Sequence, residues 1–141
     1  NGAVLDVVSG THYLGQFTVA SGNIDVSAVD NSLSSAEIGF KFDVTLTTNP
    51  IDTVGQSGAI TGEPRSMNKV IVDLNNTLSC SVNSTNLIIR QVTDDLSQAR
   101  TPVTGKREFR LLGYSKDPQV SISQSAPLSL QVNSIIAEVT F

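Results

Sequence analysis

Histidine and cysteine, two of the side-chain types that most often carry catalysis or bind metals, are scarce in this chain. His12 is the only histidine, Cys80 is the only cysteine, and Asp94 and Asp95 form an adjacent acidic pair. A serine triad would have to use His12, but the chain has no Gly-x-Ser-x-Gly elbow to present a nucleophile. We therefore expect His12 to be structural or exposed, and we predict that the chain is not an enzyme.

The cysteine and the acidic pair lack the neighbours that their chemistry would require. Cys80 alternates with Leu78 and Val82, which places it on an apolar face as a small core residue. Asp94 and Asp95 lack the spaced acidic ligands and the glycine of a calcium loop, so a solvated loop is the better interpretation. A single cysteine excludes an internal disulfide and a cysteine metal cluster. We expect no metal and no cofactor.

The sharpest charge feature is the basic cluster, defined as Lys106, Arg107, Arg110 and Lys116. Gly105 precedes it, but the upstream glycine and the Ser or Thr of a phosphate loop are missing. Few aromatic residues are interleaved with these bases, so single-stranded nucleic acid is a poorer fit than an acidic protein surface. The basic cluster is predicted to be a possible subunit contact, and a plain solvated edge is the alternative.

Composition and charge limit the function classes further. A chain of 141 residues fits one domain and can bury roughly two-thirds of its extended surface. Apolar residues make up 39% and charged residues 16%, a mixture rich in strand and turn formers. The net charge of −4 argues against a general binder of phosphate backbones. Residues 1–64 carry a charge of −6 and residues 65–141 a charge of +2, which would suit stacking between copies. No apolar run is long enough to span a membrane.

Alternating and apolar runs predict about eleven short strands and no long helix. Residues 38–47 form the longest amphipathic strand, with five large side chains on one face: Ile38, Phe40, Phe42, Val44 and Leu46. We expect this face to be buried against a second layer, where Phe42→Ala would cost about 3–5 kcal/mol. The other strands are expected at residues 3–8, 11–14, 16–19, 24–29, 69–74, 78–82, 87–92, 109–112, 119–124, 128–132 and 135–141, with a hairpin turn at residues 75–77.

Residues 48–68 show no sustained period and contain Gly55, Gly58 and Gly62. A loop of this length inside a compact domain is uncommon, and it is usually functional or disordered. It is either an arm that orders against a neighbouring subunit or a mobile surface loop. Under the first interpretation the three glycines belong to a possible subunit contact.

The predicted fold is an all-β, antiparallel β-sandwich or barrel-like domain. Residues 1–141 are expected to form a single domain in which residues 1–35 are a short-strand meander packed on residues 36–141. Because the sequence begins at Asn1 and not at Met, we expect it to be a fragment of a longer chain.

Three stretches together resemble the C-terminal part of the tail tubular protein B, or tail nozzle, family of short-tailed bacteriophages. They are residues 36–42, residues 65–72, and a third that runs from residues 104–107 through 112–117 and 120–122 to 127–128. The similarity spans roughly residues 24–141. Lys41 stands where the family often has proline, and Ser129 stands where the final proline of a Pro-Leu-Pro ending is common.

The resemblance implies a structural virion protein located in the phage tail and assembled in the cytoplasm of the bacterial host. Such nozzles are homo-oligomeric rings that attach to an adaptor and other tail proteins, and DNA passes through their channel. An alternative is a tail-tip module that binds a glycan or protein of the host surface, which a cluster of exposed aromatic residues would favour. A third possibility, an envelope hydrolase, would have to rely on His12 with Asp94 and Asp95.

Overall fold

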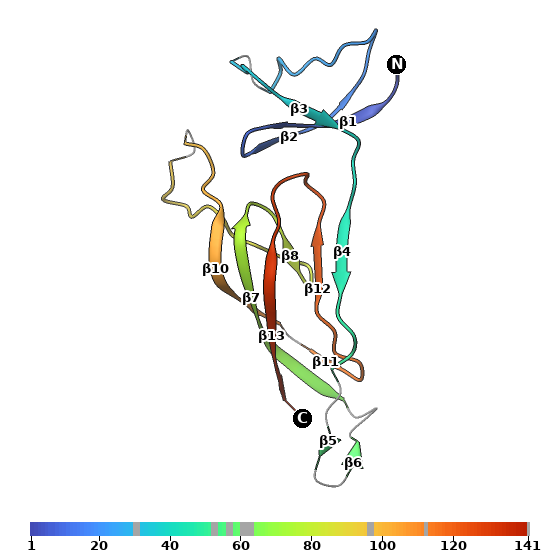
Figure 1. Cartoon of the computed structure of the whole chain (residues 1–141), viewed down its shortest axis with the longest axis vertical. Helices are drawn as coiled ribbons and strands as arrows, with labels where there is room; N and C mark the ends of the chain where they lie inside the picture. The colour runs from blue at the N-terminus through green and yellow to red at the C-terminus, as the bar shows by residue number, and fades with distance from the viewer. Residues whose placement is uncertain are drawn as a thin grey trace.

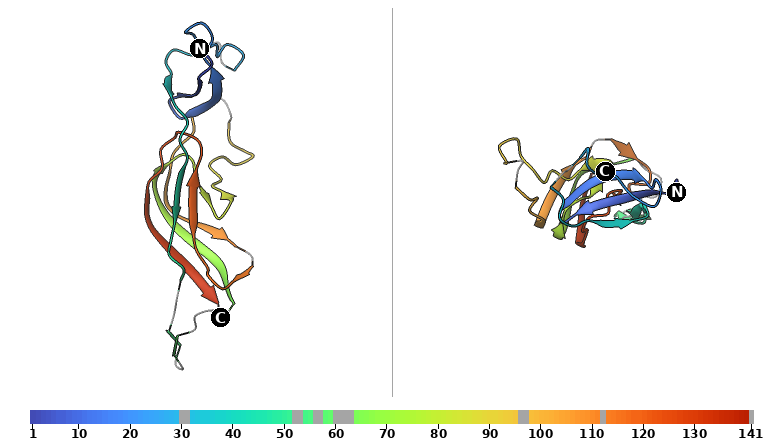
Figure 2. Two further views of the ribbon diagram at one scale, coloured as in Figure 1. Left: turned by 90° about the vertical axis from the view of Figure 1, so that its right-hand side faces the viewer. Right: turned by 90° about the horizontal axis from the view of Figure 1, so that it is seen from above.

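The computed structural model describes residues 1–29, 32–51, 54, 55, 58, 59, 64–95, 98–111 and 113–140. Every element in these ranges is a β-strand, and none is a helix, so the predicted all-β fold is confirmed (Figure 1). The chain is elongated, with a small sheet at one end, two larger sheets in the middle and a two-stranded hairpin at the other end (Figure 2). The described part contains no helix long and apolar enough to cross a membrane.

The small sheet joins three strands in the order β2-β1-β3, namely His12–Thr18, Val4–Ser9 and Glu37–Gly39. The β1–β2 hairpin turns at Gly10, whose φ of 57° is one that glycine adopts without strain. Residues 40–43 carry the chain from this sheet to the larger ones (Figure 1). The backbone N–H of Arg100 donates to Thr11 Oγ1 at 3.1 Å, which links the loop after the second large sheet to the hairpin turn.

The first large sheet is built around β7 (Arg65–Thr77). β10 (Val103–Arg110) and β11 (Tyr114–Ser115) pair with one edge of β7, and β13 (Val132–Thr140) pairs with the other. The alternation that the sequence shows over residues 69–74 places Val70, Val72 and Leu74 on the core side, each with no exposed surface. β7 is therefore the strand around which the core assembles.

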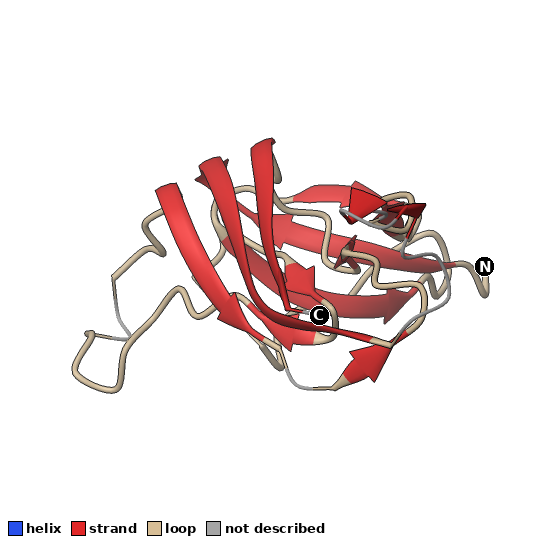
Figure 3. Ribbon diagram, turned by 90° about the horizontal axis from the view of Figure 1, so that it is seen from below, coloured by secondary structure: helices blue, strands red, loops and turns tan. Residues whose placement is uncertain are grey.

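The second large sheet has the order β4-β12-β8-β9, which are Val44–Thr47, Ser121–Gln124, Ser81–Val82 and Thr85–Asn86. Its inner residues Ile122 and Val82 lie opposite each other in register and are buried against the first sheet. The two sheets form the layers of a sandwich (Figure 3), and their contact is the main hydrophobic core. β5 (Val54–Gly55) and β6 (Gly58–Ala59) pair only with each other among the described strands.

The predicted strand over residues 38–47 is wrong in its continuity and in its burial. β3 ends at Gly39, β4 begins at Val44, and residues 40–43 belong to no ladder. All five apolar side chains are exposed, with Phe40 at 76% and Phe42 at 58%. Each half of the stretch is an edge strand of a different sheet, and at these margins the described chain covers the apolar side chains only in part.

The predicted hairpin turn at residues 75–77 is also wrong, because β7 continues through these polar residues to Thr77. Neighbouring segments satisfy their hydrogen-bonding groups: Asn75 N donates to Gln131 O at 3.0 Å, and Asn76 N donates to Thr104 Oγ1 at 3.1 Å. Thr77 is completely buried, and its hydroxyl accepts a 3.1 Å hydrogen bond from Gln131 N. Polar strand residues are acceptable where their partners are supplied in this way.

Other expected strands are absent for local reasons. Residues 24–29 form turns, because Asp25 Oδ1 accepts from Ser27 N at 2.9 Å and Val26 O accepts from Val29 N. Residues 87–92 and most of residues 128–132 lie outside the strands. Residues 11–14 and 16–19, expected as two strands separated at Gly15, form the single strand β2, and β10 begins six residues before the predicted start at residue 109.

Candidate functional site

The predicted catalytic candidates do not come together. His12 opens β2 opposite Ser9, whereas Cys80 lies in the main core at 5% exposure. Burial raises the pKa of the Cys80 thiol, which keeps it protonated and a poor nucleophile. Asp94 Oδ2 accepts from Gln91 N at 2.8 Å and so closes a turn. No group of three metal-binding side chains occurs within the described residues.

The basic cluster is divided by the structure. Lys106, Arg107 and Arg110 lie on β10, whose second edge pairs with no described strand. Lys116 follows β11, which pairs with the N-terminal end of β7. The start of β10 pairs with the C-terminal end of β7. All four side chains are exposed. Three of the four bases are therefore aligned on one edge strand, and the fourth lies beyond its end.

Acidic side chains share the outer face of this sheet with Lys106 and Arg110. Lys106 lies opposite Asp73, and Arg110 lies opposite Lys69. Lys69 in turn forms a 3.0 Å ion pair with Glu138, which raises the pKa of Lys69. Arg110 Nε also lies 3.3 Å from the Oε1 atom of Glu108. The face carries interleaved charges of both signs, a pattern that suits a protein contact or solvent better than a phosphate backbone.

Two of the three loop glycines fall within the described residues. Gly55 and Gly58 face each other in the β5–β6 hairpin. Gly62 lies outside the described residues. The hairpin lies at the far end of the molecule from the small sheet (Figure 1).

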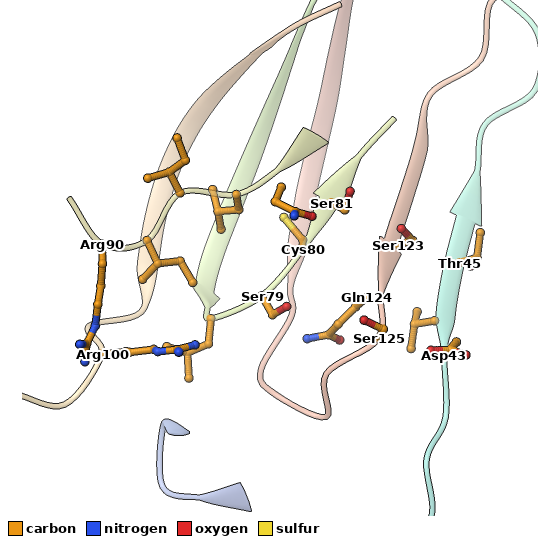
Figure 4. Close-up of a pocket in the computed structure, with 16 residues that line it drawn as sticks. Asp43, Thr45, Ser79, Cys80, Ser81, Arg90, Arg100, Ser123, Gln124 and Ser125 are labelled. Carbon is orange, nitrogen blue, oxygen red and sulfur yellow. The ribbon is translucent and has the colours of Figure 1, made fainter. Parts of the chain in front are cut away.

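A hollow of about 800 Å³ lies beside the second large sheet (Figure 4). One wall is a row of small polar side chains that the registers align across all four strands: Thr45, Ser123, Ser81 and Asn86. Arg90 and Arg100 lie on the opposite side of the hollow from Thr45 and Asp43. The lining therefore combines hydroxyl and guanidinium groups with one carboxylate and with apolar residues that include Leu78, Leu87, Ile88 and Ile89, and it contains no histidine.

The five exposed apolar side chains of residues 38–46, which we call the apolar row, form the second surface of interest. Their exposed fractions range from 39% at Val44 to 76% at Phe40. The corresponding position on the neighbouring strand β12 is covered: Leu46 is 50% exposed, whereas its cross-strand partner Ile122 is 2% exposed. The row starts on β3, crosses residues 40–43 and ends on β4, and the two strands run in different directions (Figure 1).

One buried polar pair was missed by sequence reasoning. Asp6 is 2% exposed, and Tyr13 Oη donates to its Oδ1 at 2.7 Å. Burial, followed by the hydrogen bond and the charge of Asp6, raises the pKa of Tyr13 to about 12. The available signal was an acid placed inside the apolar run of residues 3–8, which only a partner in the fold makes acceptable.

No protein-family profile matches this chain, and no curated protein matches its sequence.

Proposed function

We propose that the chain is a structural virion protein, a β-rich module of a phage tail tube or nozzle. In this role, copies assemble into a ring around the DNA channel and contact the tail adaptor and other tail proteins. The proposal combines the resemblance of residues 36–42, 65–72 and 104–128 with the all-β sandwich. It places the protein in the virion after assembly in the host cytoplasm.

The observation that carries the proposed assembly is the apolar row, a surface separate from the ring contact on β10. Monomeric proteins rarely expose contiguous apolar patches larger than a few hundred Å², and patches of this size are often functional sites of protein contact. Five large side chains between Ile38 and Leu46 are at least 39% exposed. In a protein that is part of a larger assembly, a partner subunit covers a surface of this kind.

The charges are compatible with a subunit that encloses DNA without binding it. The chain carries a net charge of −4, so a channel built from many copies repels the phosphate backbone and lets it slide. Two bases of β10, Lys106 and Arg110, share their face of the sheet with acids of β7, β10 and β13. In the proposed ring this edge contacts a neighbouring subunit rather than DNA.

The test is the size and shape of the assembly that the protein forms with its adaptor. Sedimentation and electron microscopy should show closed rings with a central channel. Reversing three bases together, Lys106→Glu, Arg107→Glu and Arg110→Glu, should prevent ring closure. The matched control is Lys41→Glu, which reverses a base away from β10 and should leave rings intact. A protein that never exceeds a dimer with its adaptor contradicts the ring.

A second candidate function is a tail-tip module that binds an anionic glycan of the host surface. The hollow lined by Ser81, Ser123, Arg90 and Arg100 favours it, because hydroxyl and guanidinium groups bind acidic sugars. Titration with a sialylated or uronic-acid oligosaccharide should shift the amide resonances of Ser81 and Ser123. Absence of any shift at these positions contradicts the glycan function and leaves the ring untouched.

A further inference from the structure

The apolar row is large enough to form most of one side of a stable contact. With about 200 Å² for a complete Phe side chain, the exposed parts of the five residues add up to on the order of 500 Å². A standard interface buries about 800 Å² on each partner. The row and the polar atoms around it therefore supply the area that one partner contributes to a stable complex.

The backbone beneath the row is also open to pairing. β3 pairs only with β1 among the described strands, and β4 pairs only with β12, so each is an edge strand. Residues 40–43 between them belong to no ladder. Edge strands usually avoid pairing with other chains by carrying charges or proline. β10 has such protection in Lys106 and Arg107, whereas residues 38–46 contain no proline and only the oppositely charged Lys41 and Asp43.

The sequence of this stretch is complementary to itself when two copies run antiparallel. With the register centred on Phe42, each Phe42 faces the Phe42 of the second copy. Phe40 then faces Val44, and Ile38 faces Leu46, so that the apolar row of one copy lies against the apolar row of the other. Gly39 faces Thr45 on the opposite side of the pair, where its missing side chain leaves room.

The charges match in the same register. Lys41 of each copy faces Asp43 of the other, so the contact contains two opposite-charge pairs related by the twofold axis. Within one chain these residues already form a 3.8 Å ion pair on the polar side of the stretch. The shift of one residue in either direction would bring apolar side chains against charged ones.

We propose that residues 38–46 dock a second copy of this chain, as an antiparallel twofold strand pair centred on Phe42. The partner is the same segment of the second copy, and the contact combines backbone pairing of the free edge with burial of the apolar row. The contact is isologous, so each copy satisfies its partner and no ring can close through it. Together with a head-to-tail contact through β10 it would produce a dihedral assembly. The proposal does not depend on the tail function.

The first test measures the mass of the isolated chain as a function of concentration. The wild-type chain should form a dimer that dissociates on dilution. Lys41→Glu places Glu opposite Asp43 at both symmetry-related positions, and it should weaken dimerisation at least tenfold. The double variant Lys41→Asp with Asp43→Lys exchanges the partners, and it should restore the wild-type dissociation constant to within about threefold.

The second test fixes the register by cross-linking. Cα atoms of facing residues in an antiparallel pair are about 4.5–5.5 Å apart, which lies within the range that a disulfide spans. Phe42→Cys should therefore form a covalent dimer under mild oxidation. In the matched control Thr45→Cys, which changes an exposed residue of β4, the two thiols would lie roughly 20 Å apart and should not cross-link. Cys80 is buried and common to both variants.

Each outcome of these tests either supports or overturns the twofold strand pair. A dimer that Lys41→Glu weakens, that the exchanged pair restores and that Phe42→Cys makes covalent supports the twofold strand pair. A chain that stays monomeric at its highest attainable concentration overturns it, as does a dimer indifferent to Lys41→Glu or an equally strong cross-link in the Thr45→Cys variant. Reversal of the β10 bases tests the ring, and Lys41→Glu tests the twofold strand pair. Either proposal can therefore be contradicted while the other stands.

Discussion

Strand β7 and the apolar row carry the same alternating pattern of large and polar residues, yet one is the centre of the core and the other is exposed. Val70, Val72 and Leu74 of β7 have no exposed surface, whereas Phe40 is 76% exposed. The difference lies in their neighbours: β7 has strands on both edges, and the row follows two sheet edges. Alternation determines which side chains share a face, and the tertiary topology determines whether that face is covered.

The largest expected difference is between two residues that face each other in the same sheet. Ile122→Ala should lower the free energy of unfolding by about 2–5 kcal/mol, because the side chain is 2% exposed and its removal leaves a cavity. Leu46→Ala, at the cross-strand position, should cost less than about 1.5 kcal/mol, since half of the side chain is already in water. Urea denaturation of both variants measures the contrast, and equal losses would show that the edge of β4 is covered.

The buried polar end of β7 should give the next largest effect. Thr77→Val removes the acceptor of Gln131 N inside the protein, so about 1–3 kcal/mol of stability should be lost. The control Thr104→Val removes the acceptor of Asn76 N at an exposed position and should cost less than about 1 kcal/mol, because water replaces it. If the two variants were equally stable, Thr77 would not anchor the end of the strand.

A smaller effect is expected from Tyr13 in alkaline solution. Its folded pKa of about 12 lies above the ordinary value of 10, so below pH 10 the proton is held in both the folded and unfolded states. Between pH 10 and 12 the unfolded chain loses this proton first, and stability falls as the pH rises. Tyr13→Phe should show a shallower fall in this range, whereas Tyr114→Phe, at an exposed site, should match the wild type.

The smallest effect is expected at Phe42, where the sequence suggested one of the largest. At concentrations where the chain is monomeric, Phe42→Ala should cost less than about 1 kcal/mol, because the ring is 58% exposed. Thermal or urea unfolding of the dilute protein tests this. A loss of 3–5 kcal/mol, the range typical of a buried Phe, would mean that the ring is buried within its own chain.

The sequence was sufficient for the fold class and for the strands with strong local patterns. Alternation over residues 69–74 and 119–124 correctly predicted strand positions in β7 and β12. It could not predict that Asn75, Asn76 and Thr77 continue β7, because their partners Gln131 and Thr104 are distant in the sequence. Local pattern carries no information about partners supplied by another part of the chain.

The same limit applies to the candidate sites. The basic cluster was visible in the sequence, but its division by β10 and β11 and its interleaving with acids depend on strand register. The row of Thr45, Ser123, Ser81 and Asn86 joins four strands, so no single stretch reveals it. Asp6 and Tyr13 were overlooked, although an acid within an apolar run was a usable signal.

The central position of β7 also limits how soon the domain can finish folding during synthesis. Its second ladder requires β13, which begins 55 residues after β7 ends. At about 5–20 residues per second, a ribosome needs roughly 3–11 s to bridge that interval. Throughout this time the edge of β7 that pairs with β13 has no partner, and such non-local pairing is intrinsically slow to nucleate. Chaperone binding to nascent chains should therefore be strongest between the emergence of residue 77 and that of residue 132.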